Sequence, residues 1–182
     1  PRLAHSVAWT VSGTLVFALS QWAVVALSAK LAGASGLGQF TFAGAVVAPI
    51  LAFAQVQLRA VLATDARYET RLRDFREVRA WLTLAMLAVT PLVAVLVTGD
   101  TVAIRVIIAF VTAKAFDSVA DILYGYHQRR EDMRSIAVGQ YVNGGLSVLL
   151  FGVILLLTRN IVLATWGYAA GSALTLLVWA LP

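Results

Sequence analysis

Long apolar runs recur six times along this chain of 182 residues, and this repetition constrains the fold more than any other feature. Each run is near the roughly 20 residues that an α-helix needs to cross a bilayer. In hydrocarbon, backbone polar groups must bond within their own segment, so such spans form helices. We therefore expect an all-α, polytopic membrane protein, built as a six-helix transmembrane bundle. The predicted spans cover about residues 7–28, 39–63, 80–97, 101–125, 135–157 and 161–181.

The composition agrees with a membrane protein and argues against an enzyme. The chain is 60% hydrophobic and 13% charged, whereas soluble domains are about half apolar and a quarter charged. It has no cysteine, which excludes disulfides and thiolate metal sites within it. His5 and His127 are its only histidines, without metal-ligand spacing, and no glycine loop for phosphate is recognisable. We expect neither catalysis nor a metal or other cofactor.

The basic residues define a topology. They cluster at the ends of apolar spans, with ten on one side of the predicted membrane against Lys30 and Arg159 on the other. By the positive-inside rule the ten are cytoplasmic, which places both termini in the cytoplasm. The net charge of +5 is therefore interpreted as a topology signal, and no nucleic acid partner is expected.

Two connections differ in character. Residues 33–38, with the sequence GASGLG, are expected to form a short turn between the first two spans. Residues 64–79 are expected to be a cytoplasmic loop. In that loop Tyr68, Leu72, Phe75 and Val78 recur at helical steps, which predicts either an amphipathic helix on the membrane surface or a solvated linker.

The fourth span is unusual because four charged side chains interrupt it, namely Arg105, Lys114, Asp117 and Asp121. Each would cost at least about 2.5 kcal/mol in hydrocarbon, so we expect them to face protein or water. At 100° per residue, Lys114, Asp117 and Asp121 share one side of the helix, whereas Arg105 projects from about the opposite side. The shared side is either a neutralised structural pair that fastens the helix to its neighbours or the polar wall of a transport cavity.

Ordered blocks of residues add a resemblance. The first comprises Gln21-Trp22, Ala29-Lys30-Leu31, Gly38-Gln39-Phe40, Ala48-Pro49, Phe53 to Arg59 and Ala63-Thr64-Asp65. The second comprises Lys114-Ala115, Asp117-Ser118, Asp121-Ile122, Tyr124-Gly125 and Gln128. Together they resemble the N-terminal half of bacterial O-antigen and polysaccharide flippases, in the multidrug/oligosaccharidyl-lipid/polysaccharide exporter superfamily. The chain departs from that family at Gln55, where Asn is common, and at Asp117, where Glu is common.

The resemblance implies one lobe of a two-lobe flippase in the bacterial inner membrane. Such a protein moves a polyprenyl-diphosphate-linked oligosaccharide by alternating access during polysaccharide or lipopolysaccharide biosynthesis. The implied partners are the lipid bilayer, the lipid-linked oligosaccharide and a second helical lobe missing from this chain, with a polysaccharide polymerase or other assembly proteins as further candidates. The alternatives are a lobe of a cation-coupled multidrug exporter and a non-transporting scaffold for polysaccharide synthesis.

The chemistry of the implied cargo indicates which residues could bind it. A diphosphate needs cations, and sugars need amide or hydroxyl partners. Asp117 and Asp121 either balance Lys114 or bind a coupling proton or sodium ion. Arg59 is alternatively a topology arginine that reaches lipid phosphates, and the amides alternatively bond between helices. The Gly144-Gly145 pair is a candidate flexing point or a packing contact. The predicted cargo-binding residues are Arg59, Lys114, Gln55, Gln57, Gln140 and Asn143.

Overall fold

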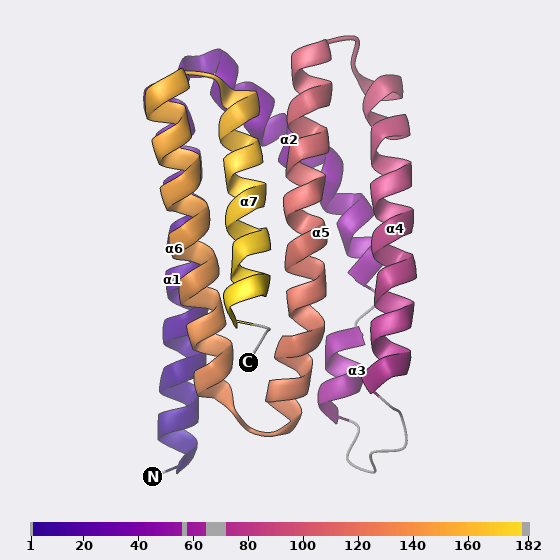
Figure 1. Ribbon diagram of the computed structural model, residues 1–182, viewed down its shortest axis with the longest axis vertical. Coiled ribbons are helices and arrows are strands. Elements are labelled where there is room, and N and C mark those ends of the chain that lie inside the picture. The colour runs from indigo at the N-terminus through magenta and orange to yellow at the C-terminus, as the bar shows by residue number, and fades with distance from the viewer. Residues whose placement is uncertain (1, 56–57, 65–71, 180–182) are drawn as a thin grey trace.

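A computed structural model describes residues 2–55, 58–64 and 72–179, and within these ranges every regular element is an α-helix. The all-α class predicted from the sequence is thus confirmed. The long helices run alternately up and down along one common direction, and both ends of the described chain point the same way (Figure 1). The helices are α1 (Arg2–Leu31), α2 (Gly33–Gln55), α3 (Leu58–Thr64), α4 (Leu72–Val97), α5 (Thr101–Arg129), α6 (Met133–Thr158) and α7 (Ile161–Trp179).

Helix α5 is the central element of the bundle. It packs against α2, α3, α4 and α7, while α6 packs against α1 and α7. In Figure 1, α4 lies on one side of α5, α1, α6 and α7 lie on the other, and α2 crosses obliquely behind. The helix whose predicted span contains Lys114, Asp117 and Asp121 is therefore surrounded by other helices of the bundle.

Several helices are long and apolar enough to cross a membrane. Among the described residues five segments meet this description, in α1, α2 with the start of α3, α4, α6 and α7. Large apolar side chains cover the outside, and Phe53 and Leu157 are 83% and 80% exposed. A surface of this kind would aggregate in water. The helices thus indicate a membrane protein. Helix α5 is not among the five apolar segments, and it is surrounded by helices that are.

Side-chain caps decide where the last three helices begin. The Asp100 carboxylate accepts the Val102 N–H at 2.8 Å, Asp132 accepts the Ser135 N–H at 3.1 Å, and Asn160 accepts the Val162 N–H at 2.9 Å. Caps of this kind satisfy amides that have no partner within the helix.

The predicted turn at residues 33–38 is wrong. Helix α2 already begins at Gly33, and the chain reverses over Ala32 and Gly33 alone. Gly33 has a φ of +70°, a left-handed conformation that costs glycine little and other residues more. One glycine is enough for the reversal, so the remaining residues of the segment join the helix.

The start of α4 also differs from the expectation. Residues 72–79, assigned from the sequence to a cytoplasmic loop, form the first two turns of α4. Phe75 is buried there against Ile122 of α5, with Leu58 and Tyr126 beside it. Of the periodic residues, Phe75 therefore packs against α3 and α5, whereas Val78 is exposed. Tyr68 lies outside the described residues.

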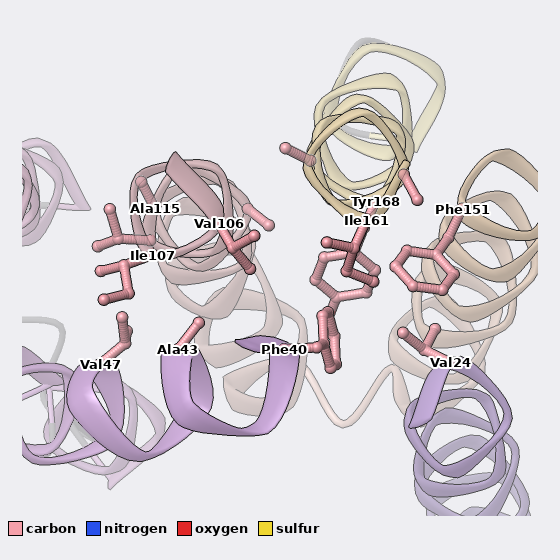
Figure 2. Close-up of a cluster of buried hydrophobic side chains, with 14 of the residues drawn as sticks. Val24, Phe40, Ala43, Val47, Val106, Ile107, Ala115, Phe151, Ile161 and Tyr168 are labelled. Carbon is pink, nitrogen blue, oxygen red and sulfur yellow. The ribbon is translucent and has the colours of Figure 1, made fainter. Parts of the chain in front are cut away.

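The apolar core fills the half of the bundle nearer the start of α5. Phe40 of α2 makes edge contacts with Phe110 of α5 and Phe151 of α6, with ring centroids 5.4 and 5.5 Å apart. Tyr168 of α7 stacks on Phe110 at 6.2 Å. Figure 2 shows Phe40, Phe151 and Tyr168 gathered between their helices, with Val24 of α1 beside them. This cluster joins five helices at one level.

Small residues let α6 and α7 approach closely. A Cβ atom added to Gly171 of α7 would lie 2.6 Å from the Cα of Ser147 in α6. Gly144 of α6 is likewise packed against Ser20 of α1, whereas a Cβ at Gly145 would meet nothing within 4 Å. Membrane helices associate through such small-residue contacts. Gly144 is therefore a packing residue within a continuous helix.

Candidate functional site

A polar cavity opens along the side of α5 that carries the charges. Its volume is about 200 Å³. Helices α1, α2, α3, α5 and α6 all contribute to it, so it lies within the bundle and beside the oblique crossing of α2. Its lining residues are Phe17, Leu51, Gln55, Arg59, Lys114, Asp117, Ser118, Asp121, Tyr124, Gln140 and Asn143.

Lys114 is held at the deep end of the cavity. Its Nζ lies 2.9 Å from Asp117 Oδ2, one turn along α5, and donates to the Tyr168 hydroxyl at 2.9 Å. The Tyr168 hydroxyl in turn donates to Gln21 Oε1 of α1 at 2.9 Å. The chain of bonds links α5, α7 and α1. It also connects the cavity with the aromatic core, because the Tyr168 ring belongs to that core.

Asn143 orients the other oxygen of Asp117. Its Nδ2 donates to Asp117 Oδ1 at 2.9 Å, while its Oδ1 accepts hydrogen bonds from Ser147 and Ser172. Both polar ends of the buried amide are therefore satisfied, as burial requires. Ser147 and Ser172 come from α6 and α7, so Asn143 connects the close pair of helices to the charged stripe.

Asp121 forms a second charged group, separate from the first. Its Oδ1 lies 3.3 Å from Nη1 of Arg59 in α3, and its Oδ2 lies 3.2 Å from Nη2 of Arg79 in α4. Arg79 also donates to Ser118 Oγ at 3.1 Å, and its side chain is only 3% exposed. One carboxylate thus pairs with a buried arginine and a partly exposed one at once, which leaves this group with a net positive charge.

The cavity adjoins a wider one toward the ends of α3 and α5. This second cavity has a volume of about 560 Å³ and shares Gln55, Arg59 and Asp121 with the first. Gln128 lines it as well and accepts a hydrogen bond from Arg59 Nε at 3.1 Å. Arg59 consequently stands at the junction of the two cavities, with its guanidinium tied to α5 at two points.

The structure brings the predicted site residues together. All of those that it describes line the first cavity, whereas Gln57 lies outside the described residues. Asp121 does not balance Lys114, as the sequence had left open, because it pairs with two arginines instead. The described members are Gln55, Arg59, Lys114, Asp117, Asp121, Gln140 and Asn143.

The expectation that every charge in the fourth span faces the interior is wrong for Arg105. Its side chain is exposed, and it lies only four residues after the start of α5 at Thr101. At 1.5 Å per residue this is about 6 Å from the helix end. A long arginine side chain covers that distance to reach the membrane surface, so Arg105 needs no protein partner.

Sequence reasoning missed Arg79, Tyr168, Gln21 and Gln128. Arg79 was counted among the loop arginines because composition changes there. In the structure the residues buried in α4 recur every three to four positions, and Arg79 belongs to this face, which mixes apolar and polar side chains. These are Phe75, Arg79, Thr83, Met86, Thr90 and Ala94.

Comparisons with known proteins give one distant relative. Over 150 residues the chain is 24% identical to "Capsular polysaccharide biosynthesis protein CapF" of Staphylococcus aureus. The match covers 82% of this chain and 37% of that protein. No protein-family model matches the chain, and no solved structure matches it. The chain is therefore distantly similar to a protein of polysaccharide biosynthesis, and its helices are those of a membrane protein.

Proposed function

We propose that this chain is one lobe of a flippase that moves a polyprenyl-diphosphate-linked oligosaccharide across the bacterial inner membrane. The observation that carries the proposal is the polar cavity beside α5, which places Arg59 and Lys114 inside a bundle whose surface is apolar. Ionisable groups inside a membrane bundle commonly mark a substrate or ion path. The distant similarity to a polysaccharide biosynthesis protein supports a sugar-linked cargo.

The charge of the site favours an anion. Three cationic groups, Arg59, Arg79 and Lys114, share two carboxylates, Asp117 and Asp121. One positive charge is therefore left over within the cluster. A diphosphate matches that excess, whereas the cationic drugs of a multidrug exporter would be repelled by it.

The arginine at the mouth is suited to first contact with the cargo. The Arg59 side chain is 34% exposed, compared with 14% for Lys114. A guanidinium offers a planar fork of donors that matches phosphate oxygens. Arg59 can leave Asp121 to bind a phosphate, because Asp121 remains paired with Arg79. The move therefore leaves no carboxylate without a cation. Gln55 and Gln128 beside it supply amides for the attached sugar.

The volumes of the two cavities limit the size of the group that can bind in them. A water molecule occupies about 30 Å³, so the inner cavity of about 200 Å³ holds only a few waters. Sites for larger ligands measure roughly 300–1,000 Å³. The adjoining cavity of about 560 Å³ is within that range. We propose that a second helical lobe, beyond residues 1–182, completes the site, because the match to the polysaccharide biosynthesis protein covers only 37% of that protein. Coupling to protons or sodium through Asp117 or Asp121 stays a prediction, and the proposed role makes or breaks no covalent bond.

The test is leaflet exchange in liposomes that contain the purified full-length protein. A fluorescent polyprenyl-diphosphate sugar should change leaflets, and Arg59→Gln should slow the exchange by at least about tenfold, since a charge-assisted hydrogen bond contributes roughly 1.5–3 kcal/mol. Arg105→Gln is the matched control, because it removes an exposed arginine away from the cavity. It should transport at the unaltered rate.

Three results would overturn the proposal. Wild-type protein that leaves the sugar lipid in its original leaflet would identify a scaffold rather than a transporter. Transport of an organic cation such as ethidium, without transport of the sugar lipid, would identify a drug exporter. Equal rates for wild type and Arg59→Gln would remove the cavity from the transport path.

A further inference from the structure

A second groove lies on the side of α5 opposite the polar cavity. It runs between α4 and α7, has a volume of about 450 Å³, and is walled by Val119, Leu123, Leu176 and Leu177. Val119 and Leu123 each follow a charged residue of the stripe by two positions, which is about 200° around the helix. The groove therefore lies on a different face of α5 from the cavity, and the two are connected through Arg79, which lines the groove and pairs with Asp121 of the cavity.

One end of the groove is cationic. Arg76 and Arg79 of α4 line it together with the apolar residues. The neighbouring Arg73 is neutralised by Glu77 at 2.8 Å, whereas exposed Arg76 forms no ion pair with any residue that the structure describes. Arg79 is paired with Asp121, yet its Nε is buried without an acceptor among the described residues. The groove thus combines an apolar trough with two arginines at one end, of which Arg76 is exposed.

We propose that this groove binds an anionic phospholipid, with the phosphate at Arg76 and an acyl chain along Leu123, Leu176 and Leu177. Charge complementarity identifies the occupant, because an exposed arginine that forms no ion pair with the described residues lies beside an aliphatic trough, and this pairing matches a phosphate joined to a hydrocarbon chain. The groove faces away from the cavity, so lipid occupies it without obstructing cargo.

Lipid retention tests this site directly. The purified full-length protein would be stripped of lipid, mixed with phosphatidylglycerol and phosphatidylcholine of identical chains, and examined by native mass spectrometry. Phosphatidylglycerol should be retained about fivefold more than phosphatidylcholine, the preference expected for one basic residue near a headgroup. Arg76→Gln should abolish the preference, and Ala80→Phe, which fills the groove from exposed Ala80, should reduce retention of both lipids.

Arg134→Gln is the control, because Arg134 is an exposed arginine of α6 that does not line the groove. It should retain both lipids as the wild type does. Equal retention of the two lipids by the wild type, or an unchanged preference in Arg76→Gln, would overturn the proposal. So would the absence of either lipid from the wild type, which would mean that another part of the protein covers the groove. None of these outcomes depends on transport.

Discussion

At the scale of single residues, the main finding is that the two carboxylates of α5, Asp117 and Asp121, pair with different cations. Asp117 pairs with Lys114 and accepts a hydrogen bond from the buried amide of Asn143, so both of its oxygens have partners within the bundle. Asp121 serves two arginines from different helices. The spacing of three residues between Lys114 and Asp117 already predicted their contact. The second group was not predictable, because Arg59 and Arg79 lie 20 residues apart in a basic segment and only folding brings them together.

Asp121→Asn tests the importance of the shared carboxylate. The substitution leaves buried Arg79 without a counter-ion, and breaking a buried ion pair typically costs about 3–5 kcal/mol. We expect the lower end of this range, because Asp121 is 24% exposed. The melting temperature of the purified protein in detergent should fall accordingly.

Glu131→Gln is the matched control for charge removal, since Glu131 is exposed in the connection between α5 and α6. Its melting temperature should equal that of the wild type. An Asp121→Asn protein that melts with the control would show that Arg79 finds another partner, and Asp121 would then have no structural role.

At the scale of elements, small side chains determine how closely two helices approach. Both α6 and α7 were predicted as spans from hydropathy, but hydropathy treats glycine and leucine faces alike and gives no information on which faces meet. The close approach at Gly171 and Ser147 is set by the absence of a Cβ atom. The same limit applies to α4, where the sequence of residues 72–79 indicated a possible helix but gave no sign that Phe75 and Arg79 are buried in the bundle.

Two glycine substitutions separate packing from helix propensity. Alanine favours a helix over glycine by about 1 kcal/mol, so Gly145→Ala, in open space, should preserve or raise the melting temperature. Gly171→Ala gains the same propensity but drives a methyl group into the backbone of α6. Overpacking of this kind costs about 1–3 kcal/mol.

Thermal unfolding of the two variants in the same detergent gives the comparison. We expect Gly171→Ala to melt below Gly145→Ala and below the wild type. If Gly171→Ala were as stable as Gly145→Ala, then α6 and α7 would separate at little cost and the tight contact would not hold them together.

At the scale of the whole molecule, the sequence predicted the class of fold better than the site. Six apolar runs and the location of arginines follow from the bilayer alone, so the helices lie close to the expected spans. The cavity depends on the oblique path of α2 and on Tyr168 from the last helix, which no local pattern encodes. The polar residues within apolar spans were nevertheless predicted to form the site, and they make up most of the cavity lining.

Membrane orientation is a testable property of the whole chain. Residues 1–182 contain no cysteine, so single cysteines can be introduced at Gly99 and Glu131, both exposed at opposite ends of α5. The arginine distribution predicts that Glu131→Cys faces the cytoplasm and Gly99→Cys faces the opposite side.

An impermeant thiol reagent added to intact cells should therefore label Gly99→Cys, and Glu131→Cys should react only after the membrane is opened. The reverse pattern would invert the topology, and cargo would then enter the cavity from outside. Labelling of both positions in intact cells would contradict a membrane-spanning α5.

The position of the aromatic core has a consequence for passage through the bundle. Phe40, Phe110 and Phe151 meet one helical turn beyond Lys114, toward the start of α5. The polar cavity around Arg59 lies on the other side of Lys114, toward the ends of α3 and α5. If the proposed transport runs along α5, a solute has to separate these three rings to reach the opposite end of the bundle, so their packing would set a barrier to its passage.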